Sequence, residues 1–61
     1  MKFTNLNGYR INISNVCAYY RRVDHYKRID SIIIEFVGGE SLALIYTDRL
    51  MAQLDSEVLL G

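Results

Sequence analysis

The chain of 61 residues has no proline or tryptophan, one cysteine, one histidine and no net charge. One cysteine excludes an internal disulfide, and one cysteine with one histidine cannot supply the four ligands of a structural zinc site. Balanced charge argues against a general polyanion binder, which is normally basic as a whole. Hydrophobic residues make up 51% of the chain, which is too large a share for a disordered segment.

Long hydrophobic runs are missing as well. No apolar stretch is long enough to cross a bilayer, and the opening residues 1–5 lack the hydrophobic core of a signal peptide. We therefore expect one small β-rich domain over 1–61, soluble and cytoplasmic, or in the host cytoplasm for a viral protein. Neither a membrane nor a DNA duplex is expected as a partner.

The strongest local signal is Asn7-Gly8, which lies between the apolar-polar segments 2–6 and 9–13. This dipeptide tolerates positive φ and suits a two-residue type I′ hairpin turn, which would pair Leu6 with Tyr9. A turn at 14–15 then leads into a third strand over 16–23, which is rich in aromatic and β-branched residues.

A second hairpin is predicted from 31–37 and 40–46, joined by a two-residue turn at Gly38-Gly39. That turn pairs Val37 with Glu40, and Ile33 with Leu44. One face then carries Ile33, Val37, Leu42, Leu44 and Tyr46, and the other carries Ile32, Ile34, Phe36, Ala43 and Ile45. Because both faces are apolar, both need a cover.

A C-terminal helix supplies one cover. Thr47 is suited to cap it, Asp48 lies at its positive end, and Gly61 is suited to end it. Its apolar stripe consists of Leu50, Met51, Leu54 and Val58. One short helix shields only one face, so we expect a second subunit on the other. The predicted fold is mainly β: a five-stranded antiparallel meander with one C-terminal helix, assembled as a homo-oligomer.

The small size of the chain leads to the same expectation. A 7.1 kDa chain gains about 90 kcal/mol from burying apolar surface, by size scaling at ~25 cal/mol per Å². Ordering its residues at ~1.5 kcal/mol each costs about the same. With neither disulfide nor metal available, a second copy is the simplest source of further stability.

The order of these elements resembles that of the small flagellar FlbD-type proteins. The features that carry the resemblance are the run 3–8, the strand ending near Ile13, the later apolar strand, Gly38-Gly39 and the short terminal helix. The chain differs in a longer basic and aromatic segment between its third and fourth strands. The resemblance implies the fold and a protein-protein interaction module. In style the chain is also similar to small, oligomeric, β-rich viral proteins that sequester nucleotide immune signals.

The segment 19–28 holds four cations, three tyrosines and the only histidine. Guanidinium groups form paired hydrogen bonds with phosphate oxygens, and tyrosine rings offer faces on which a base can stack. Because strand residues alternate, Tyr20 and Arg22 would point one way and Tyr19 and Arg21 the other. The candidate ligand-binding residues are Tyr20, Arg21, Arg22, His25, Tyr26, Lys27 and Arg28.

A simpler interpretation is that these cations prevent aggregation of an apolar sheet and form ion pairs with the acidic half of the chain. Residues 1–29 hold six cations against Asp24 alone, whereas 30–61 carry a net charge of −5. Asp24 beside His25 suggests an oriented base, but no motif places a nucleophile near them. Cys17 is expected to be a small buried residue.

The leading hypothesis is therefore a non-enzymatic, homo-oligomeric binding module that needs no cofactor or metal. It would bind or sequester a phosphate-bearing small ligand, such as a nucleotide immune signal, through the basic-aromatic segment. One alternative is an FlbD-like module that binds protein. Another is a small RNA-binding oligomer.

Overall fold

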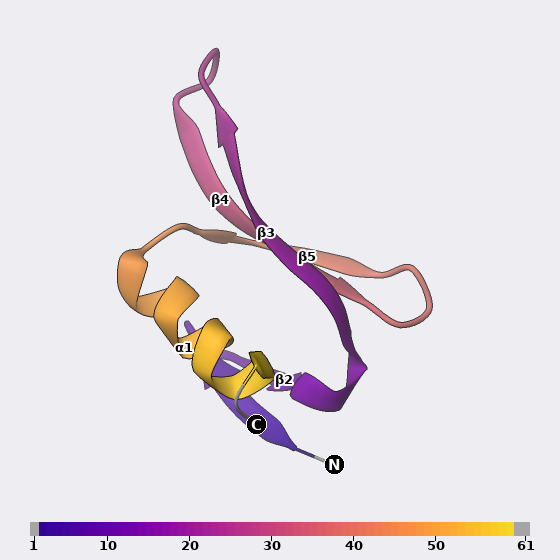
Figure 1. Ribbon diagram of the computed structural model, residues 1–61. Coiled ribbons are helices and arrows are strands. Elements are labelled where there is room, and N and C mark those ends of the chain that lie inside the picture. The colour runs from indigo at the N-terminus through magenta and orange to yellow at the C-terminus, as the bar shows by residue number, and fades with distance from the viewer. Residues whose placement is uncertain (1, 60–61) are drawn as a thin grey trace.

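The computed structural model describes residues 2–59, which form five strands in two antiparallel sheets and one helix (Figure 1). The elements are β1 (Phe3–Leu6), β2 (Tyr9–Asn12), the 3₁₀ turn η1 (Ile13–Asn15), β3 (Val16–Asp24), β4 (Ile29–Phe36), β5 (Ser41–Ile45) and α1 (Asp48–Leu59). The mainly β class with a C-terminal helix is confirmed. The single five-stranded meander is wrong, because η1 turns the chain between β2 and β3 and the sheets are β1-β2 and β3-β4-β5.

The first hairpin has the predicted register. Leu6 pairs with Tyr9 and Thr4 pairs with Ile11. Asn7 and Gly8 adopt φ angles of 53° and 90°, as a type I′ turn requires. Leu6 and Ile11 are buried, while Tyr9 remains 51% exposed.

The second hairpin differs from the prediction by one residue. The Phe36 N–H donates to the Glu40 carbonyl at 2.8 Å, and the Gly39 N–H donates to the Phe36 carbonyl at 3.1 Å. The loop therefore has three residues, 37–39. Both glycines adopt positive φ, although a three-residue loop requires a positive φ at only one position. Ile33 pairs with Ala43 instead of Leu44.

This shift corrects the assignment of the two faces, because a one-residue slip moves every side chain of a strand to the opposite side. Cross-strand partners share a face, so Leu42 and Leu44 join Ile34 and Ile32 on one side. We call this the inner face. The outer face carries Ala18, Tyr20, Arg22, Ser31, Ile33, Glu35, Ser41, Ala43 and Ile45. It is mixed in polarity, so the prediction that both faces are apolar is wrong.

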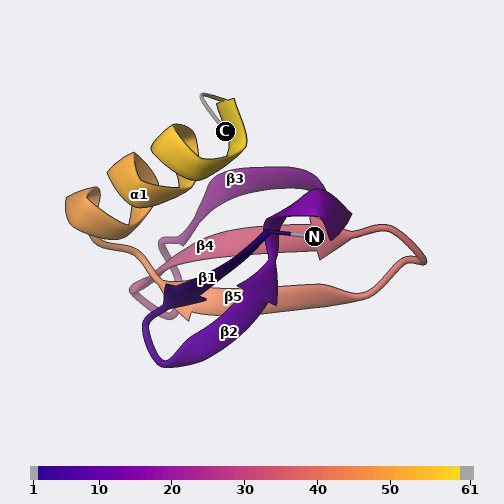
Figure 2. The same ribbon diagram turned by 90° about the horizontal axis from the view of Figure 1, so that it is seen from below.

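The inner face is covered by α1 and by the β1-β2 hairpin, and the outer face has no cover in residues 2–59 (Figures 1 and 2). The core consists of Leu6, Ile11, Ile13, Ile32, Ile34, Leu44, Leu50 and Leu54. The Thr47 hydroxyl accepts the Leu50 N–H at 3.0 Å, which confirms the predicted cap. Leu50 and Leu54 are buried and Met51 and Val58 pack beside them, as the stripe predicts. Gly61 lies outside the described residues.

Polar contacts fasten α1 to the rest of the fold. Lys2 forms a salt bridge with Glu57 at 3.3 Å, and the Tyr19 hydroxyl donates to Asp55 at 2.7 Å. Both salt bridges found in residues 2–59, Lys2–Glu57 and Arg21–Asp30, join the basic half of the chain to the acidic half. Nowhere in the described part of the chain does a helix have the length and apolar character to span a membrane.

Candidate functional site

The basic-aromatic segment forms a two-stranded arm that rises from the three-stranded sheet (Figure 1). Strand β5 ends at Ile45, which pairs with Ser31. Beyond that point β3 and β4 continue as a pair, and Asp24 pairs with Ile29 below a four-residue turn, 25–28. We define the arm as residues 22–31. It gives the molecule its long dimension, with principal extents of 38 × 25 × 20 Å.

The turn at the tip is held by one carboxylate. Asp24 Oδ1 accepts the backbone N–H of Tyr26 at 3.0 Å and that of Lys27 at 3.1 Å. Such local bonds are the usual role of an aspartate before a turn. Arg28 closes the loop at a φ of 55°. The tip therefore has a defined backbone, and the Asp24 carboxylate is already engaged.

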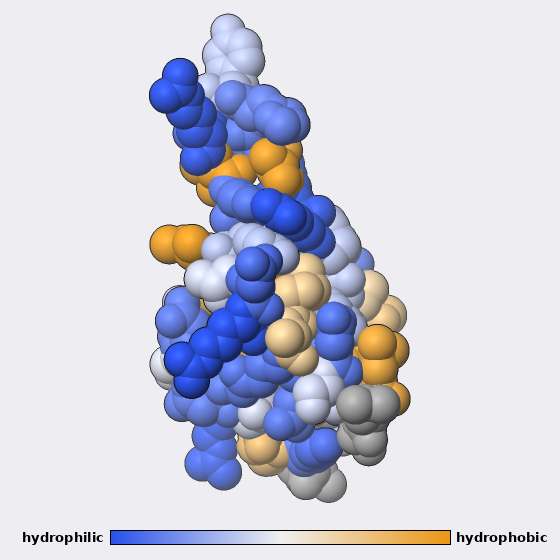
Figure 3. Space-filling view, turned by 60° about the vertical axis from the view of Figure 1, so that its left-hand side comes forward, coloured by the Kyte–Doolittle hydropathy of each residue, from blue (hydrophilic) through white to orange (hydrophobic). Residues whose placement is uncertain are grey.

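The side chains of the tip point into solvent. Tyr26 is 99% exposed, and His25, Lys27 and Arg28 are exposed beside it. Figure 3 shows this end of the molecule as largely hydrophilic, with hydrophobic surface just below it. Val23, near the end of β3, and Ile29, at the start of β4, are 43% and 49% exposed. Exposed apolar and aromatic groups among cations are suited to contact a planar ligand.

The structure divides the predicted site residues into three groups. His25, Tyr26, Lys27 and Arg28 lie together in the turn. Tyr20 and Arg22 lie on the outer face below them. Arg21 lies on the inner face, opposite Ile32. The predicted alternation of the two tyrosine-arginine pairs is confirmed.

Arg21 is occupied by contacts within the protein. Its Nε donates to Asp30 Oδ1 at 3.0 Å and its Nη2 to Asp30 Oδ2 at 2.6 Å. Its guanidinium carbon lies 3.9 Å from the centre of the Tyr46 ring. The bond to Arg21 lowers the pKa of Asp30 below its ordinary value, and the bond to Asp30 raises the pKa of Arg21. Arg21 thus fixes the base of the arm, whereas Arg22, Lys27 and Arg28 form no salt bridge within residues 2–59.

Among the described residues, the other reactive side chains lie apart, with His25 in the turn and Cys17 near the opposite end of β3. His25 is exposed in the turn, and the adjacent Asp24 binds backbone N–H groups. Cys17 is exposed where the β3-β4 register shifts, so the expectation that it is buried is wrong, because a bulge takes a residue out of strand alternation. Residues 2–59 contain no group of three His, Cys, Asp or Glu side chains that could hold a metal.

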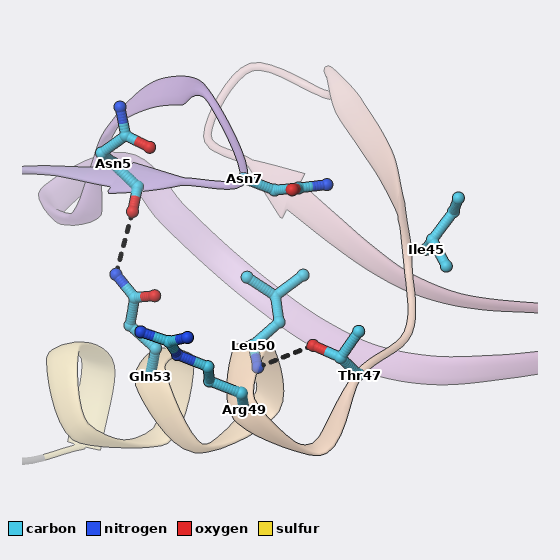
Figure 4. Close-up of a pocket in the computed structure, with 7 residues that line it drawn as sticks. All are labelled: Asn5, Asn7, Ile45, Thr47, Arg49, Leu50 and Gln53. Carbon is cyan, nitrogen blue, oxygen red and sulfur yellow. Dashed lines mark hydrogen bonds between the residues drawn. The ribbon is translucent and has the colours of Figure 1, made fainter.

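A separate hollow of about 520 Å³ lies between the β1-β2 turn, the end of β5 and the start of α1 (Figure 4). It is lined by Asn5, Asn7, Ile45, Thr47, Arg49, Leu50 and Gln53. Most polar groups there already have partners: Gln53 Nε2 donates to the Asn5 carbonyl at 2.9 Å, and Thr47 caps α1. The sequence prediction missed this hollow, because its residues come from two segments far apart in the chain, 5–7 and 45–53, and share no motif.

Comparison of the chain with protein-family models, with curated proteins and with solved structures found no match.

Proposed function

We propose that the protein is a small homo-oligomeric binding module that holds a phosphate-bearing ligand of the nucleotide class at the tip of the arm. Arg22, Lys27 and Arg28 would contact the phosphate oxygens. The Tyr26 ring would supply a face for the base, at roughly 1–3 kcal/mol for one stacked ring.

The observation that carries the proposal is the 99% exposure of Tyr26 beside His25, Lys27 and Arg28. Hydrophobic and aromatic side chains are stabilised by contact, and a ring that contacts almost nothing is available for a ligand. The neighbouring cations are exposed too, and the nearest carboxylate, Asp24, is bonded to the turn backbone. A phosphate group would be the first strong partner for these cations.

Binding without turnover is the activity that this tip supports. The turn is convex and open, so it excludes no water from a ligand, and water exclusion is what strengthens electrostatic catalysis. His25 is exposed in the turn, and the Asp24 carboxylate beside it is bonded to the turn backbone. Each copy in a homo-oligomer would carry its own arm and therefore its own tip.

The test is calorimetric titration of the protein with ATP. The arm variant Arg22→Ala/Lys27→Ala/Arg28→Ala should lose affinity by at least about tenfold for each cation that contacts phosphate. A matched variant, Lys2→Ala/Arg10→Ala/Arg49→Ala, removes the same charge elsewhere, including the hollow beside α1, and should bind ATP as the unchanged protein does.

Equal losses in both variants would show a nonspecific charge effect and refute the assignment to the arm. No heat with ATP, together with binding of a short single-stranded RNA that weakens steeply with salt, would assign the arm to RNA instead.

A further inference from the structure

Strand β5 presents an open edge. In residues 2–59 it pairs with β4 alone. The Glu40 carbonyl accepts the Phe36 N–H, and the Tyr46 N–H donates to the Asp30 carbonyl. Glu40 and Tyr46 therefore turn these backbone groups toward β4. Because bonding alternates along an antiparallel pair, the N–H and C=O groups of Ser41, Ala43 and Ile45 point away from the sheet.

The opposite edge of the same sheet is protected, and β5 is not. Strand β3 carries a register shift between Val16 and Ala18, charged residues in its second half, and α1 beside it, bonded through Tyr19. Bulges, charges and covering helices are the devices that prevent edge pairing. Strand β5 has a regular register and no charged residue.

Space lies beside this edge at both of its ends. The hollow of about 520 Å³ reaches Ile45 at one end. A second hollow of about 490 Å³ reaches Ser41 and Leu42 at the other and is lined across from them by β2 residues. Ser41, Ala43 and Ile45 are all exposed residues, which leaves this edge open to another strand.

We propose that β5 pairs antiparallel with β5 of a second copy of this chain, about a two-fold axis at Ala43. In this register Ala43 lies opposite Ala43 of the second copy, and Ser41 lies opposite Ile45. The three outward residues of each copy meet outward residues of the other, so every open N–H and C=O of this edge gains a partner. Two three-stranded sheets become one continuous sheet.

The side chains favour a second copy as the occupant. Ile45, 75% exposed in one chain, would lie against Ser41 and Ala43 of the other copy. At the strand ends Glu40 would lie opposite Tyr46, so no two like charges face each other in this register. A closed two-fold contact of this kind uses the same surface twice and leaves no β5 edge for further growth.

This inference deepens the self-association in the proposed function by naming its surface. It is independent of the ligand, because the tip of the arm lies on β3 and β4 beyond the end of β5. Failure of one is therefore distinguishable from failure of the other. ATP titration of the arm variant tests the ligand, and the mass of β5 variants tests the pairing.

The first test is sedimentation equilibrium of the unchanged chain and of Ala43→Pro. Proline removes the N–H that points out of the edge, and such edge positions tolerate it. Ala43→Ser keeps the N–H and is the matched control. We expect the unchanged chain and Ala43→Ser to sediment at twice the 7.1 kDa chain mass. Ala43→Pro should sediment at the mass of one chain, with an unchanged circular dichroism spectrum.

A second pair of variants tests the register and decides the matter even if Ala43→Pro fails to fold. Ala43 is exposed, so Ala43→Lys and Ala43→Glu should fold. Each places like charges opposite each other across the axis, and each dimer should dissociate at least about tenfold more readily. Mixing the two should restore a dimer. An unchanged chain that stays single at millimolar concentration, or two charged variants as dimeric as the original, would overturn the proposal.

Discussion

Arg21 and Asp30 form a two-pronged ion pair at the base of the arm, with nitrogen-oxygen distances of 3.0 and 2.6 Å. The two residues face each other diagonally on the inner face, from β3 and β4, and the Tyr46 ring lies against the guanidinium at 3.9 Å. The fork-like geometry of arginine suits both contacts at once. One of the four cations of the basic segment thus holds the arm and is not available to a ligand.

This difference between neighbouring arginines gives the first prediction. Arg21→Ala should lower the midpoint of thermal unfolding, because it removes two hydrogen bonds and the contact with Tyr46. Arg22→Ala should leave the midpoint close to that of the unchanged protein and weaken ATP binding. Differential scanning calorimetry and titration calorimetry on both variants check this. A lower unfolding midpoint for Arg22→Ala, with weaker ATP binding for Arg21→Ala, would contradict these two roles.

The same ion pair predicts a loss of stability in acid. The Arg21 bond holds the pKa of Asp30 below its ordinary value of 3.8. A depressed pKa gives stability that is present above the unfolded value and is lost as pH falls through the folded value. Urea unfolding between neutral pH and strong acid should therefore show a smaller loss for Asp30→Asn than for the unchanged protein. Identical pH profiles would mean that the pair contributes nothing.

Alkaline conditions should loosen the contact between β3 and α1. The hydrogen bond to Asp55 raises the pKa of Tyr19 from 10.0 to about 12, with burial adding to the shift. A raised pKa gives stability that is complete below pH 10 and is lost as pH rises toward 12. The bond to Asp48 also raises the pKa of Tyr46. Tyr19→Phe should thus lose less stability over this range than the unchanged protein, with the remaining loss due to Tyr46.

Leu54 predicts how strongly the helix supports the sheet. Its side chain is fully buried in the core between α1 and the sheets. Leu54→Ala should lower the free energy of unfolding by about 2–5 kcal/mol, most of what a domain of this size has to lose. Leu59→Ala, at a position 72% exposed on the same helix, is the control and should change it by less than about 0.5 kcal/mol. Equal effects of the two substitutions would contradict the burial of Leu54 between α1 and the sheets.

The Tyr26 ring provides a graded test of stacking. Tyr26→Phe keeps the ring, whereas Tyr26→Leu keeps an apolar side chain without an aromatic face. Since the ring is 99% exposed, neither change should alter the unfolding temperature. Tyr26→Leu should weaken ATP binding by about 1–3 kcal/mol and Tyr26→Phe by much less. Equal affinities for both variants would remove base stacking from the account.

Local turn chemistry made much of the fold predictable from sequence. Asn7-Gly8 fixes both the turn and the register of the first hairpin, and Thr47 marks the start of α1 within one residue. The register of the second hairpin was predicted wrongly by one residue, because two adjacent glycines permit a two-residue or a three-residue loop. The pairing of Phe36 with Glu40 selects the longer loop. The one additional loop residue decides whether Leu42 and Leu44 face the core.

The candidate site was only partly predictable for a related reason. Strand alternation separates Tyr20 and Arg22 from Tyr19 and Arg21 without any knowledge of the structure. The partner of Arg21 could not be inferred, because Asp30 reaches it through the register of β3 and β4. Likewise, the open edge of β5 depends on which strands fail to pair, and no local pattern in 41–45 encodes that.

The most direct test of the proposed binding site is a titration of isotopically labelled protein with ATP, followed by amide and side-chain NMR. A binding site at the tip of the arm predicts saturable shifts concentrated at residues 22–28, with the Arg21 and Lys2 side chains unaffected. Shifts concentrated instead at Asn7, Arg49 and Gln53, or an absence of shifts at the arm at saturating ATP, would contradict it.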